Sequence, residues 1–137
     1  MRAVLLWYGE QVTQEEVSEW CRETPGGCWL DEAMESLRLE GFDVEELIDD
    51  AEERIRAAIA DSEEPQPVIV TLKVPLLNAP RDHAVVLVGI RQQAEENGQS
   101  EIVEFMDPLT GQIEQDATGM LWQYWDFAGR RAFILRP

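Results

Sequence analysis

An unbroken run of apolar residues, 84–90, is the feature that most restricts what this chain can fold into. The run, AVVLVGI, is rich in β-branched residues and follows directly after His83, the only histidine of the chain. A strand without a polar face has to be covered on both sides, so the run predicts a central strand of a sheet. His83 therefore stands where a buried strand begins.

The second half of the chain repeats this strand-like character. A β-branched segment, VIVTLKV, and an alternating segment, EIVEFMD, predict two further strands, at 68–74 and 101–107. Between the central strand and 101–107 we expect a hairpin loop, QQAEENGQS. Three elements are expected at the end of the chain. They are a turn with or without a short strand at 107–115, a short aromatic helix or irregular cover at 117–129, and a last strand at 130–137.

The first half has helical spacing instead. Thr13 and Glu16 form a capping box ahead of a first helix. A second helix is expected at 29–40, with the apolar stripe Leu30, Ala33, Met34 and Leu37 and with Gly41 at its end. A third is expected at 44–60, with its apolar residues facing inward: Leu47, Ile48, Ala51, Ile55, Ala58 and Ile59.

Helices followed by strands predict an α+β fold in which N-terminal helices pack on a C-terminal antiparallel sheet. The 137 residues are enough for one core. We therefore expect a single domain over 1–137, with a helical part at 1–62 and a sheet part at 66–137.

The charge of the chain excludes some partners. Eleven Lys and Arg against 28 Asp and Glu give a net charge of −17, which argues against binding to nucleic acid or to an anionic membrane surface. Much of the charge lies at 43–64, in a segment typical of a solvated helix face. Two interpretations remain open: a surface that keeps the protein in solution, or a basic protein or peptide partner.

The location and the cysteines complete these expectations. The sequence has no apolar run long enough to cross a bilayer, and its start lacks a signal-peptide cleavage site, so we expect a cytoplasmic protein without a membrane span. Cys21 and Cys28 are expected to stay reduced there. With one histidine at this spacing they do not match a metal site, and we expect neither a metal nor a cofactor.

His83 and Asp107 are the candidate catalytic pair. His83 begins one predicted strand and Asp107 ends the next, and in an antiparallel pair these two ends lie side by side. A carboxylate beside a histidine fixes the orientation of the ring, which is the base-and-orienter half of a nucleophilic triad. The alternative is a structural histidine at a strand end beside an Asp-Pro turn.

The segments DHAVVLVGI and VEFMDPLTG resemble the His and Asp motifs of papain-like cysteine peptidases. They are most similar to the bacterial branch that cleaves double-glycine leader peptides, the bacteriocin-processing peptidases. The upstream segment, 12–47, resembles the region that follows the catalytic helix of that branch, so the resemblance covers nearly the whole chain. It implies a papain-like fold and a catalytic role for His83 and Asp107.

The nucleophile is where the chain departs from this family. The resemblance places the catalytic Cys, and the Gln that precedes it, before Met1. Cys28, in GGCWLDEAM, resembles the papain nucleophile motif, but it follows a whole predicted helix, has no Gln upstream, and lies closer to His83 than that branch usually shows. We therefore expect a domain without its nucleophile that binds a peptide or protein as an accessory module.

Two alternatives stay open. One is a compact cysteine peptidase that uses Cys28, His83 and Asp107. The other is a chain whose first helix is supplied by another polypeptide. The aromatic residues of the C-terminal part are expected either to cover the core or to line a peptide groove: Trp122, Tyr124, Trp125 and Phe127.

Overall fold

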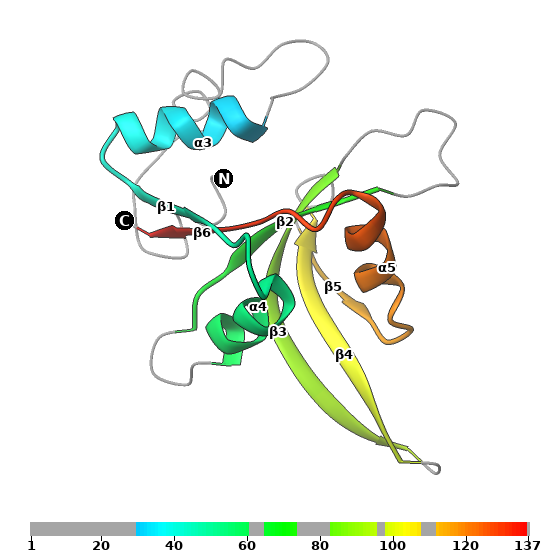
Figure 1. The fold of residues 1–137 in the computed structure, drawn as a ribbon. Helices are drawn as coiled ribbons and strands as arrows, with labels where there is room; N and C mark the ends of the chain where they lie inside the picture. Colours follow the sequence, from blue (N-terminus) through cyan, green and yellow to red (C-terminus); the bar gives the residue numbers. More distant parts are fainter. Residues whose placement is uncertain (1–29, 61–64, 74–82, 96–97, 108–111, 137) are drawn as a thin grey trace. The chain divides into compact units, whose positions relative to one another are not determined.

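The computed structural model of the chain describes residues 30–60, 65–73, 83–95, 98–107 and 112–136. These residues form three helices and six strands (Figure 1). In chain order they are α3 Leu30–Leu39, β1 Asp43–Glu46, α4 Ala51–Ala60, β2 Val68–Leu72, β3 His83–Glu95, β4 Gly98–Asp107, β5 Gln112–Asp116, α5 Met120–Phe127 and β6 Ala132–Arg136. The expected α+β class is confirmed. The helix expected after Thr13 lies outside the described residues.

The chain divides into two compact units, residues 1–45 with 135–137, and residues 46–134. The described part of the first unit contains α3 and most of β1. Three residues predicted to form an apolar stripe, Ala33, Met34 and Leu37, are at most 2% exposed, and the helix is followed by Gly41 with φ of 96°. Only glycine adopts this backbone conformation readily, so the predicted end of this helix is confirmed.

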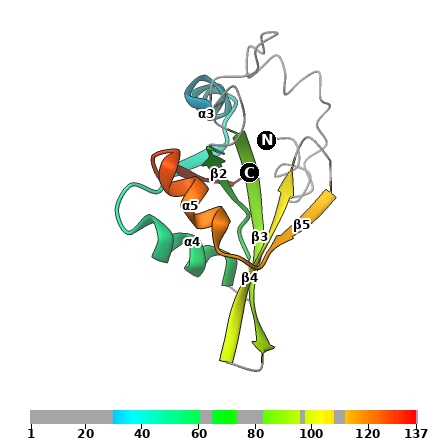
Figure 2. The ribbon, with the colours of Figure 1, turned by 90° about the vertical axis from the view of Figure 1, so that its right-hand side faces the viewer.

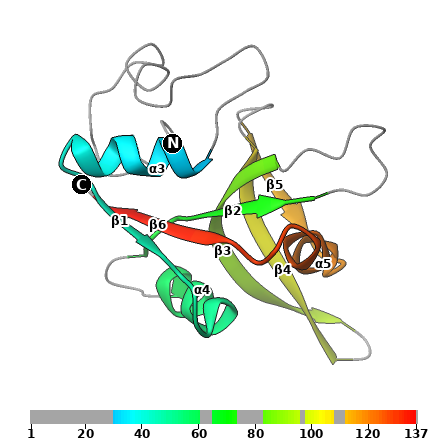
Figure 3. The same cartoon turned by 45° about the horizontal axis from the view of Figure 1, so that its top comes forward.

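The strands are hydrogen-bonded in the order β1-β6-β2-β3-β4-β5. Strand β2 pairs antiparallel with both β3 and β6, and β4 pairs antiparallel with both β3 and β5. Figure 3 shows β2 and β6 running next to each other. The apolar run 84–90 lies in β3, and β3 and β2 are the two middle strands of the sheet, each with a neighbouring strand on both edges.

One face of the sheet carries the main core of the second unit. Helices α4 and α5 lie on the same side of β3 and β4 (Figure 2), and their buried residues belong to one cluster with alternate residues of four strands. The cluster is formed by Leu47, Ile55, Ile59, Val68, Val70, Leu72, Val85, Leu87, Val103, Leu121, Trp125, Ala132 and Ile134. On the opposite face Ile69, Val86 and Phe133 are at most 4% exposed. The middle of the sheet is therefore buried on both faces, as the apolar run predicts.

The prediction of a helix at 44–60 is wrong over its first part. Residues 43–46 form strand β1, and the helix begins only at Ala51, after Asp50 with φ of 51°. In the extended segment neighbouring side chains point in opposite directions, so Leu47 is 1% exposed and Ile48 is 77% exposed. The Leu47 N–H donates to the Ala132 carbonyl at 2.9 Å. This long-range backbone pairing outweighs the local helical spacing.

The prediction of a loop at 92–100 is also wrong, because most of this segment is strand. Strand β3 runs to Glu95 and β4 begins at Gly98, and the two continue together past the ends of β2 and β5 as a ribbon (Figure 1). Residues 91–94 are exposed on this ribbon. This part of the ribbon is exposed and mostly polar, so its sequence lacks the apolar pattern of a buried strand. The sequence pattern therefore favours a loop here.

Candidate functional site

His83 and Asp107 form a direct contact. The Nε2 atom of His83 lies 2.9 Å from Oδ1 of Asp107, although 24 positions separate them in sequence. The side chain of His83 is 31% exposed and that of Asp107 is 18% exposed. The contact predicted from the strand ends is therefore present, and it is partly shielded from water while the imidazole stays accessible. Its catalytic role remains a prediction.

Strand register explains why the two side chains meet. Val86 pairs with Met106, so continuing the same register places Asp107 opposite Val85 and two positions from His83. Residues at this diagonal lie on the same face of an antiparallel pair and within reach of long side chains. The neighbouring strands support the arrangement, because His83 pairs with Leu72 of β2 and Asp107 pairs with Gln112 of β5.

The geometry also indicates which ring nitrogen is available for chemistry. A carboxylate only accepts hydrogen bonds, so the Nε2–H of His83 donates to Asp107. In the neutral ring the other nitrogen, Nδ1, is then unprotonated and able to take a proton. This arrangement holds a histidine in one tautomer and one orientation, as a general base requires.

Cys28, the thiol that sequence reasoning gives as the alternative nucleophile, lies outside the described residues, as does Cys21. The role of Cys28 as a nucleophile therefore remains a prediction. Among the described residues, no group of three or more His, Cys, Asp or Glu side chains is arranged to hold a metal ion. Within the same residues, no helix has the length and apolar character needed to cross a membrane.

The aromatic residues of α5 mostly cover the core. Trp125 is 2% exposed and donates from Nε1 to the Arg131 carbonyl at 2.9 Å. Trp122 and Tyr124 pack against the same core, and the rings of Trp122 and Trp125 meet edge to face with centroids 5.7 Å apart. Phe127 differs, because it is 57% exposed. Of the two interpretations, core cover describes three of the four residues.

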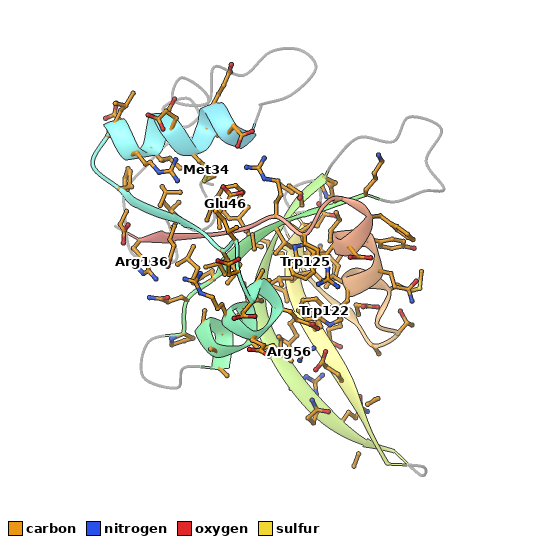
Figure 4. The ribbon with its side chains drawn as sticks, viewed as in Figure 1. Met34, Glu46, Arg56, Trp122, Trp125 and Arg136 are labelled. Atoms are coloured by element: carbon orange, nitrogen blue, oxygen red, sulfur yellow. The ribbon has the colours of Figure 1, made fainter. Side chains whose placement is uncertain are left out.

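Sequence reasoning missed a polar cluster between the helices. Arg56 of α4 binds Glu101 of β4 through both terminal nitrogens, and Trp122 of α5 donates from Nε1 to the same carboxylate at 3.0 Å. Figure 4 shows Arg56 and Trp122 close to each other between α4 and α5. The Arg56 guanidinium lowers the pKa of Glu101 below its ordinary value. Only the contact of Arg56 with Glu52, one helical turn earlier, has a local sequence pattern that could have indicated it.

An open cavity of about 570 Å³ lies elsewhere in the second unit, between the start of α4 and residues 129–131. Four carboxylates and two guanidinium groups line it: Glu46, Asp50, Glu52, Glu53, Arg130 and Arg131. Neither His83 nor Asp107 belongs to its lining. The cavity and the His83–Asp107 pair are therefore separate features of the fold.

Solved structures that are similar to this chain include two peptidase domains. The peptidase domain of Streptococcus ComA, described as a bi-functional ABC transporter involved in a quorum-sensing pathway, matches with a TM-score of 0.67 at 16% sequence identity, over 98% of this chain and 85% of that one. The peptidase domain of Streptococcus mutans ComA matches with a TM-score of 0.55 at 14% identity, over 93% and 96%. The chain therefore has the fold of these peptidase domains. No protein-family model and no curated protein sequence matches it.

Proposed function

We propose that this chain is a papain-like, leader-peptidase-like domain that binds a peptide or protein as an accessory module and does not cleave it through Cys28. The observation that carries the proposal is the 2.9 Å contact between His83 and Asp107, which preserves the base and its orienting group in a peptidase fold. As part of the proposal, residues 1–137 act as one cytoplasmic domain, and its partner is basic because the chain carries a net charge of −17.

The argument against Cys28 comes from its sequence context. A nucleophilic thiol of this fold stands at the start of a buried helix, close to the histidine and preceded by a Gln that helps to hold the oxyanion. Cys28 follows a whole predicted helix and has no Gln at that place. A peptide surface does not need the thiol, so binding is the activity that His83, Asp107 and the surrounding fold support.

A compact cysteine peptidase is the second candidate, and one observation favours it. Because Asp107 holds Nε2 of His83, the free Nδ1 is oriented as the base that a thiol would need. In this alternative Cys28 attacks the peptide carbonyl, His83 takes the thiol proton, and Asp107 stabilises the imidazolium. The two candidates differ in the reactivity of a single sulfur atom.

Alkylation of Cys28 distinguishes them. The reaction of Cys28 with iodoacetamide is measured in a Cys21→Ser background by peptide mass mapping. We expect Cys28 to react at the rate of an ordinary thiol with a pKa of about 8.5. We also expect His83→Ala to leave that rate unchanged. The matched control is the Cys28→Ser variant with Cys21 retained. Rapid alkylation of Cys28 at neutral pH that is lost in His83→Ala would favour the peptidase.

Turnover gives the second measurement. We expect no cleavage of double-glycine leader peptides or of casein, and unchanged peptide affinity in Cys28→Ala. Cleavage by the unmodified chain that disappears in Cys28→Ala, with the melting temperature preserved, would overturn the accessory-module proposal. Absence of both cleavage and peptide binding would overturn both candidates.

A further inference from the structure

We propose that the open edge of β5 is a docking site where a basic, extended peptide segment joins the sheet as an additional strand. This surface is distinct from the His83–Asp107 pair. The proposal goes beyond the accessory function above and does not depend on whether any thiol is catalytic.

The first observation is that β5 is a terminal strand. The sheet order ends at β5, whose partner in the described sheet is β4 alone. Ile113 and Gln115 are exposed, and no described strand pairs with β5 along its other edge. A strand edge with no neighbouring strand presents backbone hydrogen-bonding groups to whatever extended chain comes alongside.

The second observation is an apolar row that runs across the sheet and ends at this edge. On the face opposite α4 and α5, successive strands pair Phe133 with Ile69, Ile69 with Val86, Val86 with Met106, and Met106 with Ile113. Phe133, Ile69 and Val86 are at most 4% exposed, whereas Ile113 is 57% exposed. An added strand with an apolar residue beside Ile113 would continue the row and bury that side chain.

The third observation is charge, which determines the occupant. Residues 92–129 contain no Lys or Arg and eight Asp or Glu. Of these carboxylates, Glu101 and Asp126 are paired with Arg56 and Arg130. Arg91, just before this segment, is already paired with Glu104 at 2.8 Å. On the other face of β5, Glu114 forms no ion pair with a described residue. A strand whose apolar residues alternate with Lys or Arg would therefore place its cations beside Glu114 and its apolar residues beside Ile113.

A second copy of this chain fits the edge less well. Two β5 strands placed side by side would bring Glu114 and Asp116 of each copy close to those of the other, and like charges across neighbouring strands are unfavourable. Each copy also carries the net charge of −17. The charge pattern thus favours a basic peptide over self-association.

The position of the edge connects it to the rest of the molecule. Neighbouring strands lie about 4.8 Å apart, so a peptide on β5 would run about 10 Å from β4. Gln112 of β5 pairs with Asp107, and a peptide bound along β5 therefore passes the sheet end that carries the His83–Asp107 pair. The edge would anchor one segment of a longer basic chain there.

The test uses a hexapeptide of alternating Lys and Val, with two controls: a peptide of alternating Glu and Val, and a peptide of the same Lys and Val content in two blocks. We expect the alternating Lys–Val peptide alone to bind, by fluorescence polarisation of a labelled copy. We also expect it to slow hydrogen exchange of the β5 backbone amides, because strand addition places them in hydrogen bonds. Binding without slower exchange in β5 would overturn strand addition.

Matched variants locate the site. We expect Ile113→Asp and Glu114→Lys each to weaken binding about tenfold, because they remove the apolar contact or reverse the charge. Ile48→Asp and Glu53→Lys make the same changes at exposed positions outside β5 and should leave the affinity nearly unchanged. Melting temperatures confirm that each variant folds.

Three further outcomes would overturn the proposal. Equal losses in Glu114→Lys and Glu53→Lys, with no loss in Ile113→Asp, would show attraction to overall charge. Binding of the block peptide as tightly as the alternating one would show that strand pairing is not involved. A concentration-dependent dimer in sedimentation experiments that Ile113→Asp abolishes would show that a second copy occupies the edge.

Discussion

Arg56 lies over the ring of Trp122, with its guanidinium carbon 4.9 Å from the ring centroid. Both side chains bind the carboxylate of Glu101, Arg56 through two nitrogens and Trp122 through its indole N–H. The cluster joins α4, β4 and α5 on the face of the sheet that carries the main core. Loss of Glu101 would remove the acceptor of the Trp122 indole N–H and would leave Arg56 with Glu52 as its partner.

We expect Glu101→Gln to lower the free energy of unfolding by about 1 kcal/mol at neutral pH. Hydrogen bonding from Arg56 lowers the pKa of Glu101 below 4.5, its ordinary value. A carboxyl whose pKa is lower in the folded state stabilises the fold above its ordinary pKa, and this contribution is lost as the pH falls through the folded value. The difference from the unmodified chain should therefore shrink below about pH 4.5. Urea unfolding between pH 3 and pH 7 measures it.

The control for this experiment is Glu104→Gln. Glu104 pairs with Arg91, whose side chain is 50% exposed, and an exposed ion pair contributes little. We expect Glu104→Gln to change the free energy of unfolding by much less than Glu101→Gln does. A loss in Glu101→Gln that persists undiminished at pH 3 would show that the carboxylate charge is not what stabilises the cluster.

The sequence predicted the His83–Asp107 contact but not the Arg56–Glu101 contact, and the reason is physical. His83 and Asp107 stand at the ends of consecutive strands, so pairing of neighbouring strands is enough to bring them together. Arg56 and Glu101 lie 45 positions apart on a helix and a strand that are not neighbours in sequence. Their meeting depends on how α4 packs on the sheet, which no local pattern encodes.

The same distinction explains the correct and incorrect elements. Helix α3 was predicted well because its apolar stripe and Gly41 are local features. The segment around Val44 and Leu47 has apolar spacing that suits a helix, but pairing with β6 makes it extended, and that pairing joins residues 85 positions apart, Leu47 and Ala132. Long-range pairing therefore decided the structure where the local pattern suited more than one conformation.

Asp116 stabilises the start of α5, and we expect Asp116→Ala to lower the free energy of unfolding by about 1 kcal/mol. The residue that precedes this helix, Gly119, has no side chain to cap it. Asp116 accepts instead from the backbone N–H of Leu121 at 3.0 Å and from the Thr118 hydroxyl at 2.7 Å. Burial raises the pKa of Asp116, but these hydrogen bonds outweigh it and leave the pKa lowered.

Because the folded-state pKa of Asp116 is lowered, its contribution is present above the ordinary value of 3.8 and is lost as the pH falls through the lower folded value. Thermal unfolding at neutral and acidic pH gives the measurement. The control is Glu114→Ala. Glu114 lies on the same strand, but its carboxylate has no role at the start of the helix. An equal loss in both variants would contradict the capping role.

Salt should stabilise the fold. With a net charge of −17, self-repulsion opposes the compact state, and about 1 M sodium chloride shortens the range of that repulsion to about 3 Å. We expect the melting temperature to rise by about 2 to 5 °C between low and molar salt. A variant with Asp49→Asn and Glu53→Gln, two exposed carboxylates, should gain less. A melting temperature that is unchanged or lower in salt would contradict the role of repulsion.

Thr71 carries a buried hydroxyl, and we expect Thr71→Val to raise the free energy of unfolding by about 1 kcal/mol. The residue is 6% exposed and is the fourth of the five residues of β2, and its Oγ1 atom has no hydrogen-bond partner among the described residues. Valine has nearly the same shape and lacks the hydroxyl, so the substitution removes the cost of burying an unpaired polar atom. Urea denaturation at neutral pH measures the change.

The matched control is the reverse substitution at the preceding position of the same strand. Val70 is fully buried on the opposite face, and Val70→Thr places a hydroxyl in the core around α4 and α5. We expect this variant to lose about 1 to 3 kcal/mol. If Thr71→Val instead destabilises the fold by a similar amount, the hydroxyl of Thr71 forms a hydrogen bond in solution, and the buried face around it is more polar than the side chains of Ile69, Val86 and Phe133 indicate.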